Sequence, residues 1–518
     1  MPSNAHRPLW VHPVAAALVL ALGGHSVAQP AAPEVYSKAP EMTEDVGTPA
    51  GTGAQSAGDA PPASPNAVNG YVDSRSQLTR AKVFGVIPTG DLAQLDELLE
   101  ANLQLRHHYG EHGFVYADVS GFARAAGNFR SLGPDGQEQV ASAHDVSAYR
   151  PLFSLNELYL SQELGASLNL LLGKKRVVWG AGFGFNPTDL VNPPKDPTDP
   201  NFQRAGAYMA RLEANLGKVA FTLLASPAVL EQANGIPYGF LTYPSYDQKD
   251  RQEHYLLAAR AYALVADADV NLMLFFSNRY NDAFERKLRV GASFSRYFFT
   301  DYELHVEALF QQGSARRYPT PACAPDALQA FLCARFATPL LEQRKLDDST
   351  LYPRVLVGTR RQFNDESLLS VEYYFQADGY TQAEFQGYVD QLELAKRERQ
   401  LTAGLAPSGG GGEAGIPQKF AFEPVGRHYL FLNYSKPKLF DDWTVGAVLI
   451  ANLSDLSSVL TPSVSWSATE WMTLTLSGFL PLSGPRSLAA TTNAGGSFGE
   501  YTLTPFSYRA LFEARVFY

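Results

Sequence analysis

Apolar and polar residues alternate along most of the chain beyond residue 100. Segment 302–310 has apolar residues at even positions and polar residues at most odd ones, and 254–261, 369–376 and 472–480 alternate in a similar way. A period of two predicts β-strands with one apolar and one polar face. The runs extend over roughly ten residues, whereas strands of soluble proteins average about 5 to 6 and a tilted membrane-crossing strand needs about 9 to 11. The pattern therefore favours strands that cross a membrane.

Connections between these strands are of two kinds. Short turns are predicted at Gly217-Lys218, Ala266 to Asp269, Thr300-Asp301, Phe363 to Asp365, Pro437 to Asp441 and Ala468 to Glu470. Long polar connections are predicted at 127–151, 181–203, 227–252, 313–350, 378–426 and 483–506. Short periplasmic turns and long extracellular loops are typical of a transmembrane barrel. A soluble β-sandwich, the alternative, does not sort its connections in this way.

The last predicted strand ends with the final residue of the sequence. Its apolar face includes Phe512, Val516 and Tyr518. This strand resembles the terminal strand of bacterial outer-membrane barrels, which ends on an aromatic residue that the barrel-assembly machinery recognises. The resemblance implies that these three residues are the assembly signal. It also implies that the assembly machinery and the outer-membrane lipid bilayer are partners.

The strand count follows from the position of the chain end. An odd number of candidate strands lies between Ala101 and Tyr518, whereas bacterial barrels have even numbers and both termini in the periplasm. One further strand must therefore come first, and Gln77 to Ile87 is the candidate. Residues 91–100 have leucines at helical spacing behind Asp91, which predicts a short helix or a loop turn. The predicted fold is all-β, a transmembrane antiparallel β-barrel of about 18 strands, or about 16 if two runs are false.

The segment before the barrel is expected to contain an export signal and a spacer. An apolar stretch from Val14 to Leu22 follows Arg7, and Ser26-Val27-Ala28 supplies small residues for cleavage, so residues 1–28 are predicted to be a signal peptide. Residues 29–74 are rich in Ala, Pro, Gly and Ser, and they offer too little apolar surface to offset the entropy of ordering. We expect 29–74 to be a disordered periplasmic spacer and 75–518 to be a barrel in the outer membrane of a Gram-negative bacterium.

Overall charge excludes one class of partner, and the alternation places other charges inside the barrel. The net charge of −10 at pH 7 argues against nucleic-acid binding, which needs a basic stripe.

Rings of Arg in a pore favour the passage of anions. Alternatively, the Arg and acidic side chains pair across strands and fill the barrel. The predicted pore-lining residues are Arg106, Arg124, Arg211, Arg260, Arg289, Glu303, Glu307, Arg354, Arg360, Glu372, Arg509, Glu513 and Arg515, with Asp118 and Glu213 among the further acids.

Residues 173–200 form a proline-rich segment that begins with a strand ending in Trp-Gly. Its prolines fix the backbone and prevent it from joining a sheet. A constriction loop folded into the pore is predicted, with a rigid external loop as the alternative. The residues of this predicted constriction loop are Trp179, Gly180, Asn186, Pro187, Asp189, Asn192, Pro193, Lys195 and Asp196. The Trp-Gly, Asn-Pro-x-Asp and Asn-Pro motifs resemble a segment of porin-like barrels of the alginate-export type, which implies a conducting barrel for saccharide polymers.

Other candidate chemistry in the sequence is sparse. Cys323 and Cys333 lie in one long loop of a chain exported to an oxidising compartment, which predicts a disulfide that closes a short loop. His107, His108 and His112 cluster near a turn, but neighbouring strand residues point to opposite faces, so no metal site is predicted. No Gly-x-Ser-x-Gly motif is present. No catalytic residue and no cofactor are predicted.

The function predicted from these features is a non-enzymatic outer-membrane channel. The expected cargo is a hydrophilic, anionic solute or an exopolysaccharide, with a periplasmic export partner in the polymer case. A general nutrient-uptake porin is the nearest alternative. An outer-membrane hydrolase and a plugged barrel that acts as an adhesin are alternatives from other classes.

Overall fold

The computed structural model describes residues 66–82, 91–126, 130–132, 138–140, 152–192, 206–227, 237–238, 241–242, 255–277, 287–299, 301–314, 317–319, 341–343, 350–385, 387, 424–483, 488–489, 497–503 and 506–518. The signal peptide predicted at 1–28 and most of the predicted spacer lie outside these residues. So do Cys323, Cys333, Pro193, Lys195 and Asp196. The predicted disulfide and the distal part of the predicted constriction loop therefore stay predictions.

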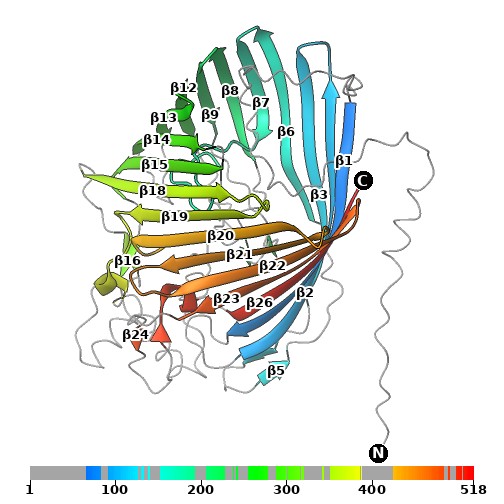
Figure 1. Ribbon diagram of the computed structural model, residues 1–518, viewed down its shortest axis with the longest axis vertical. Helices are drawn as coiled ribbons and strands as arrows, with labels where there is room; N and C mark the ends of the chain where they lie inside the picture. Colours follow the sequence, from blue (N-terminus) through cyan, green and yellow to red (C-terminus); the bar gives the residue numbers. More distant parts are fainter. Residues whose placement is uncertain are drawn as a thin grey trace, which may run out of the picture.

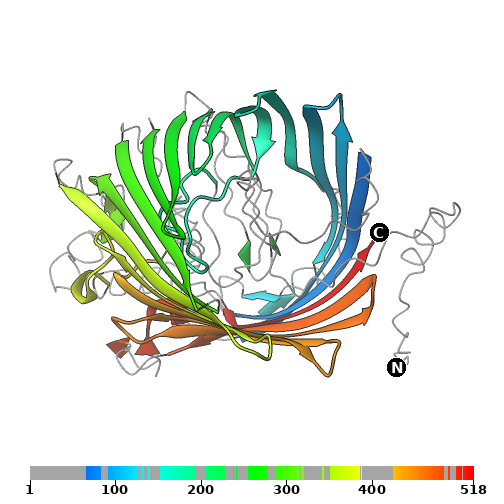
Figure 2. The ribbon, with the colours of Figure 1, turned by 45° about the horizontal axis from the view of Figure 1, so that its top comes forward.

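Eighteen antiparallel strands close into one barrel (Figures 1 and 2). Each strand pairs with its neighbours along the chain, and the first strand, β1, closes the ring by pairing with the last, β26. The barrel strands are β1 (Asn66–Lys82), β2 (Asp91–His108), β3 (Gly113–Ala126), β6 (Leu152–Gly165), β7 (Leu168–Lys175), β8 (Ala207–Leu216), β9 (Val219–Ser226), β12 (Leu256–Val265), β13 (Ala268–Ser277), β14 (Lys287–Phe298), β15 (Tyr302–Gln312), β18 (Leu351–Gln362), β19 (Leu368–Gln376), β20 (His428–Leu439), β21 (Trp443–Asn452), β22 (Ser458–Thr469), β23 (Met472–Leu482) and β26 (Phe506–Phe517). The predicted fold class and strand number are confirmed.

The two rims of the barrel differ in their connections. One rim has short turns, such as 217–218 between β8 and β9 and 266–267 between β12 and β13. The N-terminal end of β1 pairs with the end of β2 at this rim, where Asn66 lies opposite His107. The other rim carries the long connections, which contain the small hairpins β4 (Arg130–Leu132) with β5 (Glu138–Val140), β10 (Pro237–Tyr238) with β11 (Leu241–Thr242), β16 (Arg317–Pro319) with β17 (Leu341–Gln343), and β24 (Leu488–Ala489) with β25 (Ser497–Phe498), as well as the 3-10 helix η3 (Glu500–Leu503).

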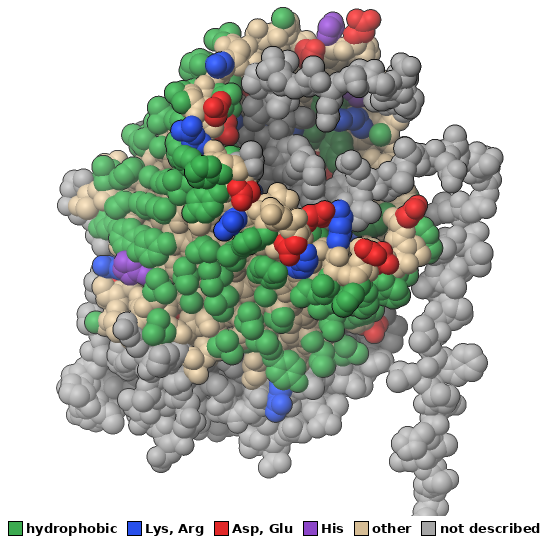
Figure 3. Space-filling view, viewed as in Figure 1, with side chains coloured by type: hydrophobic (Ala, Val, Ile, Leu, Met, Phe, Trp, Pro, Cys, Tyr) green, Lys and Arg blue, Asp and Glu red, His purple; other side chains and the backbone are tan. Residues whose placement is uncertain are grey.

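The outer wall of the barrel is apolar. Leu223, Leu272 and Leu274 expose 58%, 61% and 52% of their surface and belong to a large exposed apolar face, as expected of a wall in contact with lipid. Figure 3 shows a mostly hydrophobic outer face on the side in view. Aromatic side chains gather at the short-turn rim, where Phe299 and Phe440 are exposed, as expected of a girdle at a membrane interface. The closed, apolar-walled barrel places the chain in the bacterial outer membrane.

The helical content of the described residues is small. Among them, no helix is long and apolar enough to cross a membrane.

The N-terminal end of the barrel differs from the prediction. β1 begins at Asn66, so the boundary expected at residue 75 falls inside a strand. The first strand was expected at Gln77 to Ile87, but β1 spans 66–82, and residues 83–87 lie outside the described residues. The alternation of β1 is weak because Ser74 and Ser76 stand on the same face as Leu78.

The prediction of a helix or a loop turn at 91–100 is wrong. This stretch is the first half of β2, and it pairs with β1 on one side and with β3 on the other. Leu98 is buried inside the barrel whereas Leu95 and Leu99 are exposed on the outside. Leucines on both faces of one strand mimic helical spacing. The backbone hydrogen bonds of β2 to β1 and to β3 stabilise the strand instead of a helix.

Candidate functional site

The candidate site is the inner wall of the barrel, together with the segment that follows β7. Along β15, burial alternates so that Glu303, His305 and Glu307 point inward and are 4% exposed or less. The apolar residues between them form part of the outer wall. The same alternation places polar side chains inside on the other strands. The interior is therefore polar where the exterior is apolar.

The predicted pore-lining residues occupy inward positions on their strands. Arg211, Arg260, Arg289, Glu303, Glu307 and Glu372 are buried, and Arg354, Arg360, Arg509, Glu513 and Arg515 are partly exposed. Arg106 is exposed near the short-turn rim, with its Cζ 4.5 Å from the centre of the Phe114 ring. Arg124 lies on β3 opposite Leu98, and its side chain is outside the described part of the chain.

Residues 176–192 leave the end of β7 and fold into the barrel, a segment we call the inner loop (Figure 2). Trp179 is 1% exposed, and its ring centre lies 5.4 Å from that of Phe275 on β13. Arg260 on β12 lies over the same indole, at 6.0 Å. The inner loop thus packs against the inside of the wall.

One carboxylate of the wall binds the inner loop at two places, residues 181–182 and Thr188. Glu307 on β15 accepts hydrogen bonds from the N–H groups of Ala181 and Gly182, each at 2.5 Å. Its other oxygen accepts the hydroxyl of Thr188 at 2.7 Å and the Thr188 N–H at 3.3 Å. Hydrogen bonds from neutral donors to a charged acceptor are stronger than those between neutral groups. Glu307 therefore fixes both sides of a tight loop.

A second carboxylate binds the tip of the inner loop. Glu372 on β19 accepts hydrogen bonds from Phe183 N–H at 2.5 Å, Gly184 N–H at 2.9 Å and Phe185 N–H at 3.3 Å. His305 lies beside it, with its Nε2 3.2 Å from the carboxylate. Three successive N–H groups that converge on one carboxylate form an anion-binding nest. The donors of the inner loop, which would otherwise be unpaired inside the barrel, are satisfied by the wall.

Aromatic packing completes the attachment. The ring of Phe185 stacks on Tyr374 at 4.8 Å, and Phe183 contacts Phe431 at 6.2 Å between centres. Gly184 lies so close to the Phe431 ring that a Cβ at this position would overlap it. Gly180 has φ +112°, and a Cβ there would lie 2.6 Å from the Glu307 carboxylate. Glycine is therefore required at both positions.

The remaining predicted residues of the constriction loop lie in the same segment. Asn192 Nδ2 donates to Asp189 Oδ1 at 3.0 Å, and Val177 N–H donates to Asn192 Oδ1 at 3.2 Å. Pro187 is buried, and the side-chain nitrogen and oxygen of Asn186 are buried as well. The structure thus places the described part of this loop inside the barrel and not outside it.

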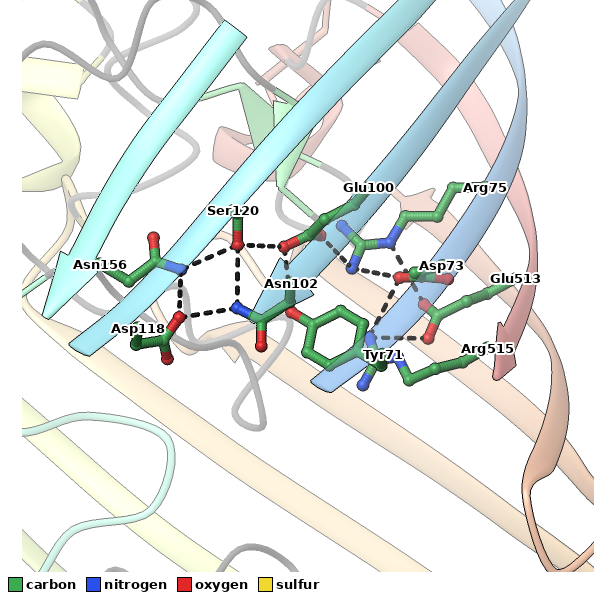
Figure 4. Close-up of polar contacts among 10 residues, drawn as sticks. All are labelled: Tyr71, Asp73, Arg75, Glu100, Asn102, Asp118, Ser120, Asn156, Glu513 and Arg515. Atoms are coloured by element: carbon green, nitrogen blue, oxygen red, sulfur yellow. Dashed lines mark hydrogen bonds and ion pairs between the residues drawn. The ribbon is translucent and has the colours of Figure 1, made fainter. Parts of the chain in front are cut away.

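A second polar network on the inner wall was missed from the sequence (Figure 4). Arg75 lies 2.5 Å from Asp73 and 3.3 Å from Glu100, and Tyr71 donates to Glu100 at 3.0 Å. The network continues through Ser120, Asn102, Asp118 and Asn156 onto β3 and β6. Asp118 was among the predicted inward acids. Asp73 and Arg75 were missed because the first strand was expected to begin at residue 77, and Glu100 was missed because 91–100 was expected to be a helix or a loop turn. An inward acid is also present on β6, where Glu157 accepts the Arg176 N–H at 2.6 Å.

The histidines near the first short turn are not brought together. His107 faces Asn66 at 2.7 Å, His108 packs on Phe114, and His112 lies 3.2 Å from Glu163. Among the described residues, no group of three or more His, Cys, Asp and Glu side chains could hold a metal ion.

Several solved structures are similar to this chain over most of its length. The crystal structure of Pseudomonas aeruginosa OpdL matches with a TM-score of 0.43 and 7% identity, over 88% of this chain and 98% of that one. Pseudomonas aeruginosa OccK7 (OpdD) matches with a TM-score of 0.44 and 10% identity, over 87% and 98%. The outer membrane channel DcaP of Acinetobacter baumannii matches with a TM-score of 0.36 and 10% identity, over 88% and 97%.

No family model and no curated protein matches the sequence. The fold therefore rests on the strand pairing of this chain, and the alginate-export resemblance stays a prediction.

Proposed function

We propose that the barrel is a non-enzymatic channel that carries hydrophilic solutes across the outer membrane. The inner loop is the observation that carries this proposal. An 18-stranded barrel is wide enough to leave an aqueous path, and a loop held against one inner wall by Glu307 and Glu372 narrows that path. A rigid narrowing inside a wide barrel is what a selective pore requires.

Shortening the inner loop tests the constriction. Removal of residues 180–190 is expected to raise single-channel conductance roughly twofold or more while the barrel still folds, because the wall alone is wide enough to conduct. Removal of Gly409 to Gly412 from another predicted long connection is the control and should leave conductance unchanged. Equal conductance of the wild type and the 180–190 variant would contradict the constriction. A wild type that does not conduct would favour the plugged-barrel alternative.

The finer proposal is that the solute is anionic. Two of the buried acids, Glu307 and Glu372, are used by the backbone of the inner loop, while guanidinium groups lie beside that loop. Arg360 lies 5.4 Å above the Phe183 ring and pairs with Glu303 at 3.4 Å, and Arg260 lies above Trp179. Cations at a narrowing favour anion passage. This arrangement supports carboxylated solutes such as sugar acids.

The reversal potential under a salt gradient tests the charge preference. We expect an anion-selective wild type, and weaker selectivity when Arg354 and Arg360 are both changed to Ala. Arg361→Ala is the matched control, because Arg361 is the neighbour of Arg360 on the opposite face and pairs with Asp301 at 3.7 Å. Cation selectivity of the wild type, or no shift in the double variant, would contradict the proposal.

Exopolysaccharide is the second candidate cargo. The motifs in residues 173–200 favour it through their resemblance to alginate-export barrels. Both cargoes would pass along the same aqueous path through the barrel. They differ in size, so the largest molecule that passes the inner loop distinguishes them.

A further inference from the structure

The barrel is closed by the pairing of β1 with β26, which we call the seam. At the seam two inward-pointing pairs face each other directly: Asp73 is opposite Arg515, and Arg75 is opposite Glu513. The Arg515 Nη2 lies 3.2 Å from Asp73 Oδ2, and the Arg75 Nε lies 3.5 Å from Glu513 Oε2. Asp73 has no exposed side-chain surface. Both pairs therefore meet on the inner wall.

These four residues, the seam quartet, also bond along each strand. Arg75 lies 2.5 Å from Asp73 on β1, and Arg515 lies 2.9 Å from Glu513 on β26 (Figure 4). Arg75 further contacts Glu100 on β2 at 3.3 Å. The last strand is thus tied through β1 to the second strand of the barrel.

The seam differs from the other pairings of the barrel in how its register is set. The other barrel strands pair with neighbours along the chain, and the connection between them limits their register. Asp73 and Arg515 are 442 residues apart, and no connection joins the ends of β1 and β26. Side chains must therefore specify the register of this pair.

The order of charges in the seam quartet penalises slipped registers. A slip of two residues in one direction places Asp73 opposite Glu513, and in the other direction it places Arg75 opposite Arg515, as follows from the observed register. Like charges directly opposite each other are destabilising. A slip of one residue would turn the charged side chains of one strand toward lipid. The observed register is the one that pairs both opposite charges.

We propose that the seam quartet is a register lock for barrel closure, which selects the alignment in which β1 and β26 join. This register lock would act during assembly, whatever the channel carries.

Inverting the charges of one strand tests the lock. In the variant Glu513→Arg, Arg515→Glu, the native register places like charges opposite each other. A two-residue slip in either direction instead places one positive side chain opposite one negative side chain. Disulfide formation reports the register in a background with Cys323 and Cys333 changed to Ser. Cysteines at Ser74 and Ala514 are partners in the native register, while Ser76 with Ala514 and Val72 with Ala514 report the two slips.

We expect the native crosslink to dominate in the unchanged strand. In the inverted variant the ratio of native to slipped crosslinks should fall by about tenfold, because two attractive pairs become repulsive. Adding Asp73→Arg and Arg75→Asp should restore the native ratio. The matched control is Arg211→Glu with Glu213→Arg on β8, where the same kind of pair at the same spacing lies on a strand joined to its neighbour by a short turn. This control should keep the native seam.

An inverted variant with the wild-type crosslink ratio would overturn the lock. If the inverted variant does not fold, the lock is tested by the heat-modifiable migration of the variant in which all four residues of the seam quartet are exchanged. Its recovery supports the lock, and its failure contradicts it.

Discussion

Single carboxylates determine where the inner loop lies, and Glu372 offers a direct test. We expect Glu372→Gln to weaken attachment of the loop tip by about 3 kcal/mol, because the amide loses the charge and one of the two oxygens that accept N–H donors. Hydrogen exchange of the Phe183 and Gly184 amides should become faster. The control is Glu213→Gln on β8, whose carboxylate faces Arg211. Unchanged exchange in Glu372→Gln would show that aromatic packing alone holds the tip.

A buried carboxylate at the rim with long connections leads us to expect that the docking of η3 depends on pH. Burial raises the pKa of Glu500, on η3, to about 7, although Tyr429 and the Val425 N–H donate to its carboxylate at 2.6 and 2.9 Å. Nearby Asp455 raises this pKa as well. Because the docked state binds the proton more tightly, docking of η3 is strongest below pH 4.5 and weakens as the pH rises through 7.

The expected loss is about 3 kcal/mol between these limits. Protection of the 499–503 amides against exchange, compared at pH 5 and pH 8, measures it. Glu500→Gln should remove the dependence because it cannot titrate. Equal protection of the wild type at both pH values would contradict the prediction.

The contacts of the inner loop show what the sequence could not provide at the residue level. Glu307 and Glu372 were predicted to point inward because alternation on a strand is a local property. Their partners Thr188 and Phe183 lie 119 and 189 residues away. Nothing in the spacing of residues indicates that a backbone N–H will meet a particular carboxylate. The prolines and glycines of the segment predicted a stiff loop folded into the pore, with an external loop as the alternative, but they did not indicate which wall residues it would contact.

At the scale of elements, strands with lipid on one side were predictable and β1 was not. A strand such as β15 separates leucine and valine from glutamate and histidine, since one face meets lipid and the other meets water. β1 carries Ser74 and Ser76 on the outer face, so its pattern is weak. Its place is set instead by hydrogen bonding to β2 and β26.

The last strand carries a prediction about assembly. Tyr518 lies on the outward side of the seam, exchanges both backbone hydrogen bonds with Gly70, and donates its hydroxyl to the carbonyl of Asn102 at 2.7 Å. We expect Tyr518→Asp to block insertion, because a charge on the lipid side near the rim replaces the aromatic ring and the hydroxyl contact is lost. Tyr518→Phe, which keeps the ring, should insert. Normal heat-modifiable migration of the Tyr518→Asp protein on a gel would contradict the role of this residue as an assembly signal.

At the scale of the whole molecule, the interior charges are more balanced than the predicted pore lining suggested. The network at the seam adds Asp73 and Glu100 to the acids and only Arg75 to the bases. The sequence could not show this balance, because the acids lie on segments whose alternation was not recognised. Charge selectivity would then depend on which charged side chains lie beside the inner loop rather than on the total charge of the interior. The position of the inner loop relative to Arg260 and Arg360 is therefore the feature on which the proposed anion selectivity depends.

The size of solute that the whole barrel admits separates the two proposed cargoes. If the inner loop narrows the path for small anions, swelling of liposomes that contain the protein should be fast with a monomeric uronic acid and should slow steeply toward the hexamer. Removal of residues 180–190 should move this cut-off to longer oligomers, because the barrel wall alone is wide. Proteoliposomes with the Arg361→Ala protein are the control and should behave as the wild type. If the hexamer enters as fast as the monomer through the wild type, the narrowing does not limit size, and passage of a polymer becomes the better account of the barrel.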